Sequence, residues 1–183
     1  MNRRELLCEI TALTSLPYLA SGLRLRASSA GLASRAEEAQ QNPGDTSRFY
    51  PGFKPFDVKT SGAVIHGVVG GQGPPLLLLH GAPQTHVSWR LVAPKLAEEY
   101  TVVAADLRGY GDSSKPPDGE NHANYSKRAM ALDQVEVMKH FGFDRFPVVG
   151  QDRGGRVTHR MVLDHADNVT HAAVLDVPVR QST

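Results

Sequence analysis

The chain shows short apolar runs that alternate with stretches of helical period from about residue 53 onward. Buried strands are predicted over residues 76–79, 101–105, 147–149 and 171–176. A hairpin is predicted from 56–59 and 63–69, which flank Ser61-Gly62, and helices are predicted over 89–99, 125–140 and 154–165. Strands that alternate with helices are typical of an α/β fold with a mostly parallel sheet, here opened by a hairpin.

The predicted helix over residues 125–140 carries apolar residues at intervals of three: Ala129, Leu132, Val135 and Met138. We expect these four side chains to form one buried stripe.

The first 52 residues have a different character. Arg3 and Arg4 precede a charge-free apolar stretch over residues 10–23 and then small residues up to Ala33, which is similar to a twin-arginine export signal. Residues 1–35 are therefore predicted to direct export to the periplasm, and residues 36–52, rich in polar residues, Pro and Gly, to be a linker. An amphipathic N-terminal helix on a cytoplasmic protein is the alternative. The apolar stretch is shorter than the roughly 20 residues that span a bilayer, so no stable membrane anchor is expected after processing.

The composition limits the classes of partner and cofactor that the chain is expected to bind. With 20 Lys plus Arg, 19 Asp plus Glu and a formal net charge of +1, the chain lacks the basic excess of nucleic-acid-binding proteins. Cys8 is the only cysteine, which excludes an intramolecular disulfide and a cysteine-based zinc cluster. The histidines lack metal-ligand spacing, and His86 is expected among the loop or surface residues. A small-molecule partner without cofactor or metal is predicted.

Gly150-Gln151-Asp152-Arg153-Gly154 lies between a predicted strand and a predicted helix. This setting is typical of a nucleophile elbow, in which the central residue has a strained backbone and flanking glycines allow the turn to close. Asp152 would be the nucleophile. The alternative is that Asp152 only caps the following helix.

A second motif, His80-Gly81-Ala82-Pro83, directly follows the predicted strand 76–79. It resembles the HGxP element of epoxide hydrolases and dehalogenases, and from residue 53 to residue 176 the order of motifs resembles the α/β-hydrolase fold. The resemblance implies that the backbone N–H groups of Ala82 and Arg153 form an oxyanion hole. His80 is interpreted as a structural part of this motif.

Arg153 and Arg156 fall in the first turn of the helix after the elbow, where the helix dipole disfavours cations. Asp152-Arg153-Gly154-Gly155-Arg156 resembles fluoroacetate dehalogenases, which implies that the two arginines bind a haloacid carboxylate while Asp152 attacks the α-carbon. The alternative is that they form structural ion pairs with Asp106, Asp112 or Asp176.

The same resemblance assigns Asp176, at the end of strand 171–176, as the triad acid; the alternative is a turn residue. In α/β-hydrolases the catalytic histidine comes late in the chain, and His159, His165 and His171 are poorly placed for that role. We therefore expect residues 53–183 to be an incomplete core with about six of eight strands, without the cap domain and inactive in turnover.

The resulting prediction is a hydrolase of carbon–halogen bonds in short 2-haloacids that acts through an aspartyl ester. The alternatives are an epoxide hydrolase, which shares the aspartate nucleophile and HGxP, and a non-catalytic fragment. The preferred halogen and acyl chain and the oligomeric state are left open.

Overall fold

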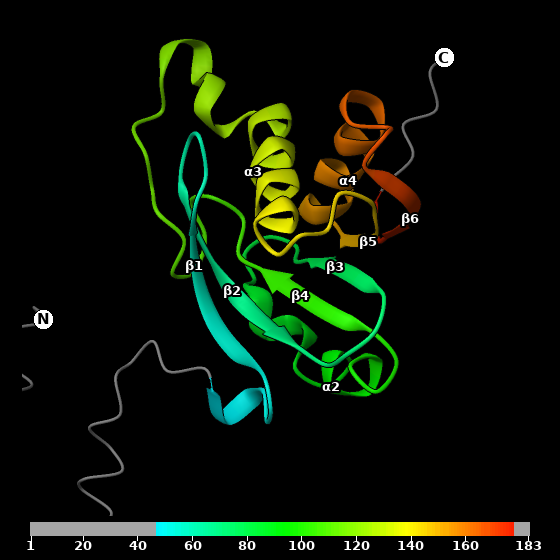
Figure 1. Cartoon of the computed structure of the whole chain (residues 1–183). Coiled ribbons are helices and arrows are strands. Elements are labelled where there is room, and N and C mark those ends of the chain that lie inside the picture. Colours follow the sequence, from blue (N-terminus) through cyan, green and yellow to red (C-terminus); the bar gives the residue numbers. More distant parts are fainter. Residues whose placement is uncertain (1–46, 178–183) are drawn as a thin grey trace, which may run out of the picture. The chain divides into compact units, whose positions relative to one another are not determined.

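The computed structural model describes residues 47–177, so the predicted export signal over 1–35 lies outside the described residues (Figure 1). The strands are β1 (Lys54–Lys59), β2 (Val64–Gly70), β3 (Pro75–Leu79), β4 (Thr101–Ala105), β5 (Phe146–Gln151) and β6 (Val169–Leu175). The α-helices are α2 (Ala93–Leu96), α3 (Lys127–His140) and α4 (Arg153–Asp164), and the 3-10 helices are η1 (Ser47–Phe49), η2 (His86–Trp89) and η3 (Glu120–Tyr125).

The six strands form one sheet in the order β1-β2-β4-β3-β5-β6. β1 pairs antiparallel with β2 and β2 with β4, whereas all other neighbours are parallel. Leu79 at the end of β3 lies opposite both Ala105 of β4 and Gly150 of β5. The predicted hairpin and parallel sheet are confirmed. The motifs that follow β3, β4 and β5 lie together at the carboxyl ends of these strands.

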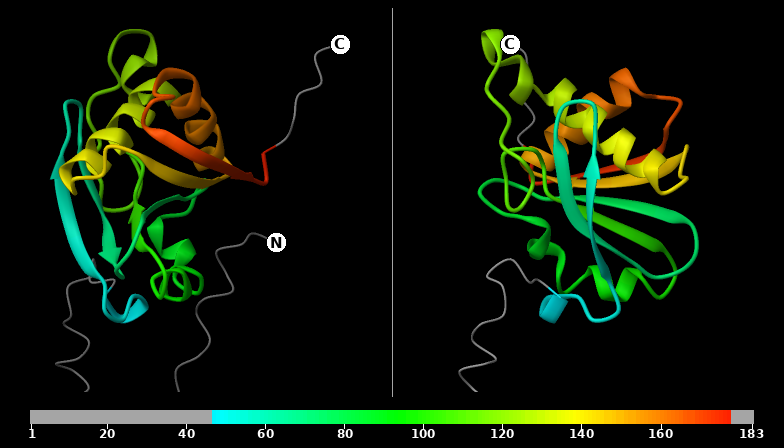
Figure 2. Two further views of the ribbon diagram at one scale, coloured as in Figure 1. Left: turned by 45° about the vertical axis from the view of Figure 1, so that its right-hand side comes forward. Right: turned by 60° about the vertical axis from the view of Figure 1, so that its left-hand side comes forward.

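Helices cover both faces of the sheet (Figure 2). On one face, Leu77, Leu79 and Val103 pack against buried residues of α3 and α4. On the other face, Leu76 and Leu78 pack with Trp89 of η2 and other apolar residues. Apolar side chains on both faces of β3 explain why its sequence is a continuous run of leucines. None of the helices in residues 47–177 is long and apolar enough to cross a membrane.

The predicted buried stripe on α3 is wrong in two of its four members, because Leu132 is 38% exposed and Ala129 is only partly buried. A strict interval of three residues drifts round a helix of 3.6 residues per turn, so four such positions cannot share a face. The buried side of α3 instead includes Met130, Gln134, Val137 and Met138.

The predicted helix over residues 89–99 is also interrupted. η2 ends at Trp89, and α2 spans only Ala93–Leu96 with Pro94 in its first turn. Proline has no backbone N–H and is tolerated only at a helix start, so the helix begins here rather than at Trp89.

The ordered core begins before residue 53. Tyr50, within the region assigned to a linker by composition, is 1% exposed, and its hydroxyl donates a hydrogen bond to the carbonyl of His86. The linker prediction is therefore wrong at Tyr50, because it followed the polar composition of residues 36–52 and not this one aromatic residue.

Candidate active site

Asp152 lies at a sharp turn between β5 and α4. Its backbone has φ 45° and ψ −108°, a conformation that few non-glycine residues adopt. Its N–H donates to the carbonyl of Leu175 at 2.8 Å, and its side chain makes no capping hydrogen bond to α4. The side chain of Asp152 therefore does not cap α4, which contradicts the capping alternative.

The glycines on either side of Asp152 have no room for a side chain. A Cβ on Gly150 would lie 2.4 Å from the carbonyl oxygen of Gly154 and from Oγ1 of Thr158. A Cβ on Gly154 would lie 2.4 Å from the carbonyl oxygen of Leu79. Close approach of β3, β5 and α4 is thus the physical reason for both glycines.

Two backbone N–H groups face the Asp152 carboxylate. The N–H of Ala82 donates to Oδ2 at 3.0 Å, and the N–H of Arg153 also donates to the carboxylate. These hydrogen bonds, with Ala82 the strongest cause, hold the pKa of Asp152 below its usual value despite partial burial, and the Arg156 and Arg153 guanidinium groups act in the same direction. The carboxylate is ionised at neutral pH.

Arg153 and Arg156 make no ion pair with an acidic side chain within the described residues. The guanidinium of Arg153 lies 5.5 Å from the ring centre of Tyr110, and Arg156 is exposed. Of the carboxylates considered as structural partners, Asp106 is bound to His86 instead. The structural ion pairs expected as the alternative are absent from residues 47–177.

Asp106, at the end of β4, is fully buried. Its Oδ1 accepts hydrogen bonds from the backbone N–H of His86 at 2.6 Å and from Nδ1 of His86 at 3.0 Å, and its Oδ2 accepts from the N–H of Asp112 at 3.1 Å. Burial alone would raise the pKa of Asp106, but the hydrogen bonds from His86 outweigh burial and lower it. His86 was expected in a loop or at the surface and is instead buried, because Asp106 holds it.

His80 is a structural residue of the same loop. Its Nε2 accepts the N–H of Leu107 at 3.0 Å, so its proton is on Nδ1, which donates to the carbonyl of Gly81 at 2.7 Å. Burial lowers the pKa of His80, so the ring stays neutral. Both ring nitrogens are used, and His80 cannot serve as a base for Asp152.

A second buried ion pair lies away from Asp152. Arg108 donates to the two oxygens of Asp133 on α3, at 2.5 and 2.6 Å, and Thr60 donates to Oδ1 of the same carboxylate at 2.6 Å. This cluster joins the β1–β2 turn, the loop after β4 and α3. The sequence pattern did not lead us to predict this role for Asp133. A charged residue among the apolar positions of the predicted helix was the feature that could have indicated it.

Asp176 directly follows β6 with φ 53° and is exposed. It neighbours Leu175, whose carbonyl accepts the Asp152 N–H, so the two aspartates are brought to the same edge of the sheet. His159 and His171 are exposed and His165 follows the end of α4; no hydrogen bond joins Asp152 to a histidine within residues 47–177.

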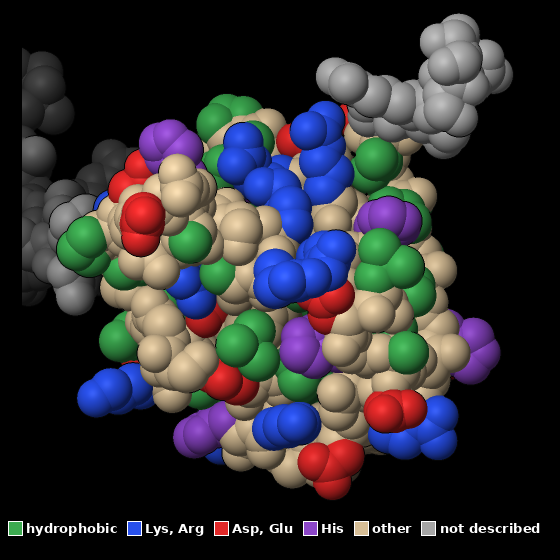
Figure 3. All heavy atoms as spheres, turned by 90° about the horizontal axis from the view of Figure 1, so that it is seen from above, with side chains coloured by type: hydrophobic (Ala, Val, Ile, Leu, Met, Phe, Trp, Pro, Cys, Tyr) green, Lys and Arg blue, Asp and Glu red, His purple; other side chains and the backbone are tan. Residues whose placement is uncertain are grey.

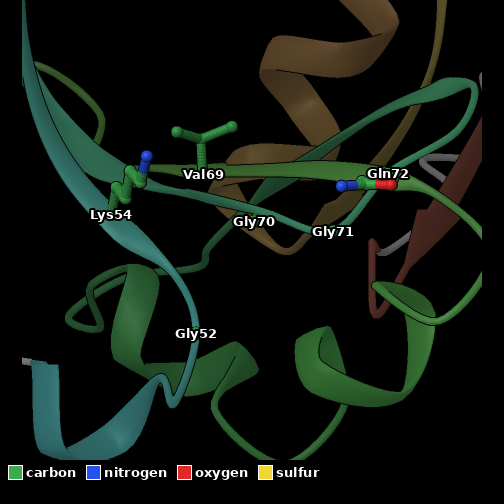
Figure 4. Close-up of a pocket in the computed structure, with 6 residues that line it drawn as sticks. All are labelled: Gly52, Lys54, Val69, Gly70, Gly71 and Gln72. Carbon is green, nitrogen blue, oxygen red and sulfur yellow. The ribbon is translucent and has the colours of Figure 1, made fainter.

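One hollow in the described surface lies away from this site. It is lined by Gly52, Lys54, Val69, Gly70, Gly71 and Gln72 (Figure 4). Gly70 pairs with Val102 at the beginning of β4, whereas Asp152 follows the carboxyl end of β5, so the hollow lies toward the opposite end of the strands. Lys54 is its only charged side chain, and we assign it no catalytic role.

Comparison with known proteins agrees with this geometry. Residues 74–182 match the model of the α/β-hydrolase fold family. The chain belongs to this family. A solved structure of a protein from Nostoc sp PCC 7120, described as an α/β hydrolase, superposes with a TM-score of 0.68 at 57% identity, covering 70% of this chain and 44% of that chain.

Two groups of enzymes occur among the relatives. Fluoroacetate dehalogenase from Burkholderia sp is 59% identical over 128 residues, covering 70% of this chain and 42% of the relative. Soluble epoxide hydrolase from Corynebacterium sp. (strain C12) is 45% identical over 117 residues, covering 64% of this chain and 39% of the relative. The chain thus spans less than half of each relative. The α/β-hydrolase assignment is confirmed, and both relatives are named as enzymes.

Proposed function

We propose that Asp152 displaces halide from the α-carbon of short 2-haloacids and forms an aspartyl ester. The observation that carries this proposal is a single arrangement: an ionised carboxylate on a strained elbow, beside two arginines that form no ion pair with an acidic side chain of residues 47–177. A guanidinium binds a carboxylate through two parallel hydrogen bonds and so fixes the angle of approach. Arg153 and Arg156 are the proposed substrate-binding residues.

The proposed step needs no base, because a carboxylate is already a nucleophile at neutral pH. Oδ2 of Asp152 accepts the Ala82 N–H, so we expect Oδ1 to attack. The oxygen–carbon bond forms as the carbon–halogen bond breaks, and the halide leaves with the bonding electron pair. The Ala82 and Arg153 N–H groups then lie beside the ester carbonyl, where they would stabilise an oxyanion.

Ester hydrolysis additionally needs a base to activate water. We propose Asp176 as the acid that orients such a base, since it lies at the same edge of the sheet as Asp152. We assign the base to none of residues 47–177. The 183-residue chain is therefore expected to form the ester and to release at most about one equivalent of halide.

Chloroacetate provides the test. Incubation with the 183-residue chain should release stoichiometric chloride and leave a carboxymethyl group on the peptide that contains Asp152, detected by mass spectrometry. The isosteric Asp152→Asn variant is the control and should acquire no group at this position. Absence of a group on Asp152 in a folded chain, or equal modification of the variant, would contradict the proposal.

Epoxide opening is the second candidate, favoured by the 45% identity to soluble epoxide hydrolase. The same aspartate could attack a neutral epoxide, in which case the two arginines would have no anion to bind. Arg156→Ala separates the candidates. It should slow modification by chloroacetate and leave modification by a neutral epoxide such as styrene oxide unchanged; a preference for the epoxide in both proteins would favour the second candidate.

We also propose that residues 1–35 direct export, on the basis of Arg3 and Arg4 and the apolar stretch that follows. Fusion of these residues to a reporter should carry it to the periplasm, and replacing both arginines with lysine should stop export. Export of the lysine variant would contradict the proposal.

A further inference from the structure

The side chain of Arg153 lies against an aromatic ring and not against a carboxylate. Its guanidinium carbon lies over the ring of Tyr110, 5.5 Å from the ring centre. No acidic side chain of residues 47–177 forms an ion pair with Arg153. Figure 3 shows a similar scarcity of acidic side chains on one face of the molecule, where Lys and Arg side chains gather. The ring of Tyr110 is therefore the neighbour that restrains this guanidinium.

The ring of Tyr110 is itself held in place. It is partly buried against the core and meets the ring of His80 edge-on, with 5.3 Å between the ring centres. His80 is fully buried, and both of its ring nitrogens are hydrogen-bonded within the protein. The backbone N–H of Tyr110 donates to the carbonyl of Leu107 at 3.0 Å, and its carbonyl accepts the N–H of Ser113 at 3.1 Å. Tyr110 thus presents a fixed ring beside the elbow.

The turn that carries Tyr110 is anchored to two strands. Oδ2 of Asp106, which follows β4, accepts the N–H of Asp112 at 3.1 Å, and the Ser113 hydroxyl donates to the carbonyl of Asp106 at 2.8 Å. The N–H of His66 on β2 donates to the same hydroxyl at 2.9 Å. The position of the ring is therefore set by β2 and β4, whereas Arg153 belongs to α4.

Contact with a ring restrains a guanidinium without using its hydrogen-bond donors. A cation over an aromatic face is attracted by the negative charge of that face, whereas the N–H groups of arginine point outward in the plane of the guanidinium. A protein carboxylate would also restrain Arg153, but it would occupy the donors that an anionic substrate needs. Freedom that a side chain has already lost in the free protein is not lost again on binding, which favours affinity.

We propose that Tyr110 is a positioning residue of the Asp152 site, whose ring holds the Arg153 guanidinium with its N–H donors free for the substrate carboxylate. Arg153 directly follows Asp152, so a guanidinium held in one place also fixes where that carboxylate lies relative to the nucleophile. The inference rests on the proposed function, because it assumes an anionic substrate. Tyr110 acts through Arg153 and has no role in bond breaking.

The rate of Asp152 modification in the full chain, measured at increasing chloroacetate concentration, separates affinity from chemistry. Tyr110→Met removes the ring and fills its space with a flexible side chain. This variant should raise the half-saturating chloroacetate concentration by about two- to fivefold, the effect of losing one cation–π contact. Its limiting rate should be unchanged. Tyr110→Phe keeps the ring face and should restore the half-saturating concentration of the unaltered chain.

Tyr125→Met is the matched control. Tyr125 is also partly buried against the core, and its hydroxyl donates to the carbonyl of Pro116 at 2.7 Å. No arginine lies over its ring within the described residues. This variant should lower the stability of the chain and leave the half-saturating chloroacetate concentration unchanged; an increase equal to that of Tyr110→Met would overturn the inference.

Three further measurements separate a role through Arg153 from a general distortion of the elbow. Chloroacetamide carries no charge, so its reaction with Asp152 should be the same in Tyr110→Met and in the unaltered chain. In a chain that already carries Arg153→Met, Tyr110→Met should have no additional effect, because the ring then has no cation to hold. In the unaltered chain, NMR should show the Arg153 Nε–H resonance shifted upfield by the ring, which tests the contact without any change at position 110.

The outcomes distinguish this inference from the proposed function. A half-saturating chloroacetate concentration that rises in Arg153→Met but not in Tyr110→Met would overturn the role of Tyr110 and leave the proposed function in place. Equal slowing of chloroacetate and chloroacetamide in Tyr110→Met would show a structural effect and also overturn that role. An unshifted Arg153 resonance would do the same, even if Tyr110→Met does not fold. A folded, unaltered chain that chloroacetate does not modify at Asp152 would overturn both.

Discussion

The carboxyl ends of β4 and β5 each carry an aspartate, and the two are used in opposite ways. Asp106 after β4 is fully buried, and both of its oxygens accept hydrogen bonds from the protein. Asp152 after β5 is partly exposed, and its Oδ2 accepts a hydrogen bond from the Ala82 N–H. Each carboxylate accepts a backbone N–H from the loop after β3, His86 for Asp106 and Ala82 for Asp152.

The difference shows how one loop can be rigid and still serve the proposed reaction. Hydrogen bonds to Asp106 hold the loop in place, so the Ala82 N–H would be presented to Asp152 without further cost at the moment of that reaction. A carboxylate whose hydrogen-bonding capacity is used by the protein stabilises structure, whereas one with an oxygen still accessible can act on a substrate. Replacing Asp106 should therefore affect mainly the stability of the fold, and replacing Asp152 mainly the proposed reaction.

The largest effect on stability is expected at Asp106. Asp106→Ala leaves the His86 and Asp112 donors without their acceptor, and it should lower the free energy of unfolding by about 3 kcal/mol. Urea unfolding measures this loss. Asp152→Ala is the matched variant and should change stability by less than about 1 kcal/mol; an equal loss in both variants would contradict the comparison.

A smaller effect is expected at the elbow glycine Gly154. The added Cβ in Gly154→Ala would lie 2.4 Å from the backbone carbonyl of Leu79, so β3 and α4 must move apart. We expect a loss of about 2 kcal/mol in unfolding free energy, and a slower reaction of Asp152 with chloroacetate. Gly142→Ala tests the separate effect of positive φ, since Gly142 has φ 82° and no atom within 4 Å of its Cβ position, whereas φ of Gly154 is not positive.

Backbone strain at Asp152 should be measurable as a gain in stability. Asp152→Gly removes the side chain from a residue with φ 45°, which should raise the free energy of unfolding by about 1 kcal/mol relative to Asp152→Ala. The same variant should not react with chloroacetate. Equal stability of the Gly and Ala variants in thermal unfolding would argue that the turn is unstrained.

The smallest effect is expected from pH. Since hydrogen bonds hold the pKa of Asp152 below its usual value, the proposed nucleophile stays ionised as pH falls, and its contribution to stability is lost only below the ordinary aspartate range. The rate of Asp152 modification by chloroacetate should be constant from pH 8 to about pH 5 and should fall only below about pH 4. A midpoint near pH 6 would mean that burial, not hydrogen bonding, dominates this carboxylate.

Much of the fold could be predicted from local pattern. Strands buried on both faces, such as β3, are continuous apolar runs, and the elbow follows from glycines at the positions where backbones approach. Prediction failed where the outcome depended on distant partners. His86 is buried because Asp106 accepts its two N–H groups, and neither residue alone indicates the other.

The sequence by itself determined which motif follows each strand: HGxP follows β3, Asp106 follows β4, and Asp152 with two arginines follows β5. Local steric requirements explain this, because a tight turn can be recognised from the glycines that it needs. Only the tertiary structure decided which charges meet. Packing of α3 against α4 gives Arg128 an ion pair with Asp164, whereas its neighbour Lys127 forms no ion pair within residues 47–177. Adjacent cations on a helix point in different directions, so their partners depend on the helix that lies beside them.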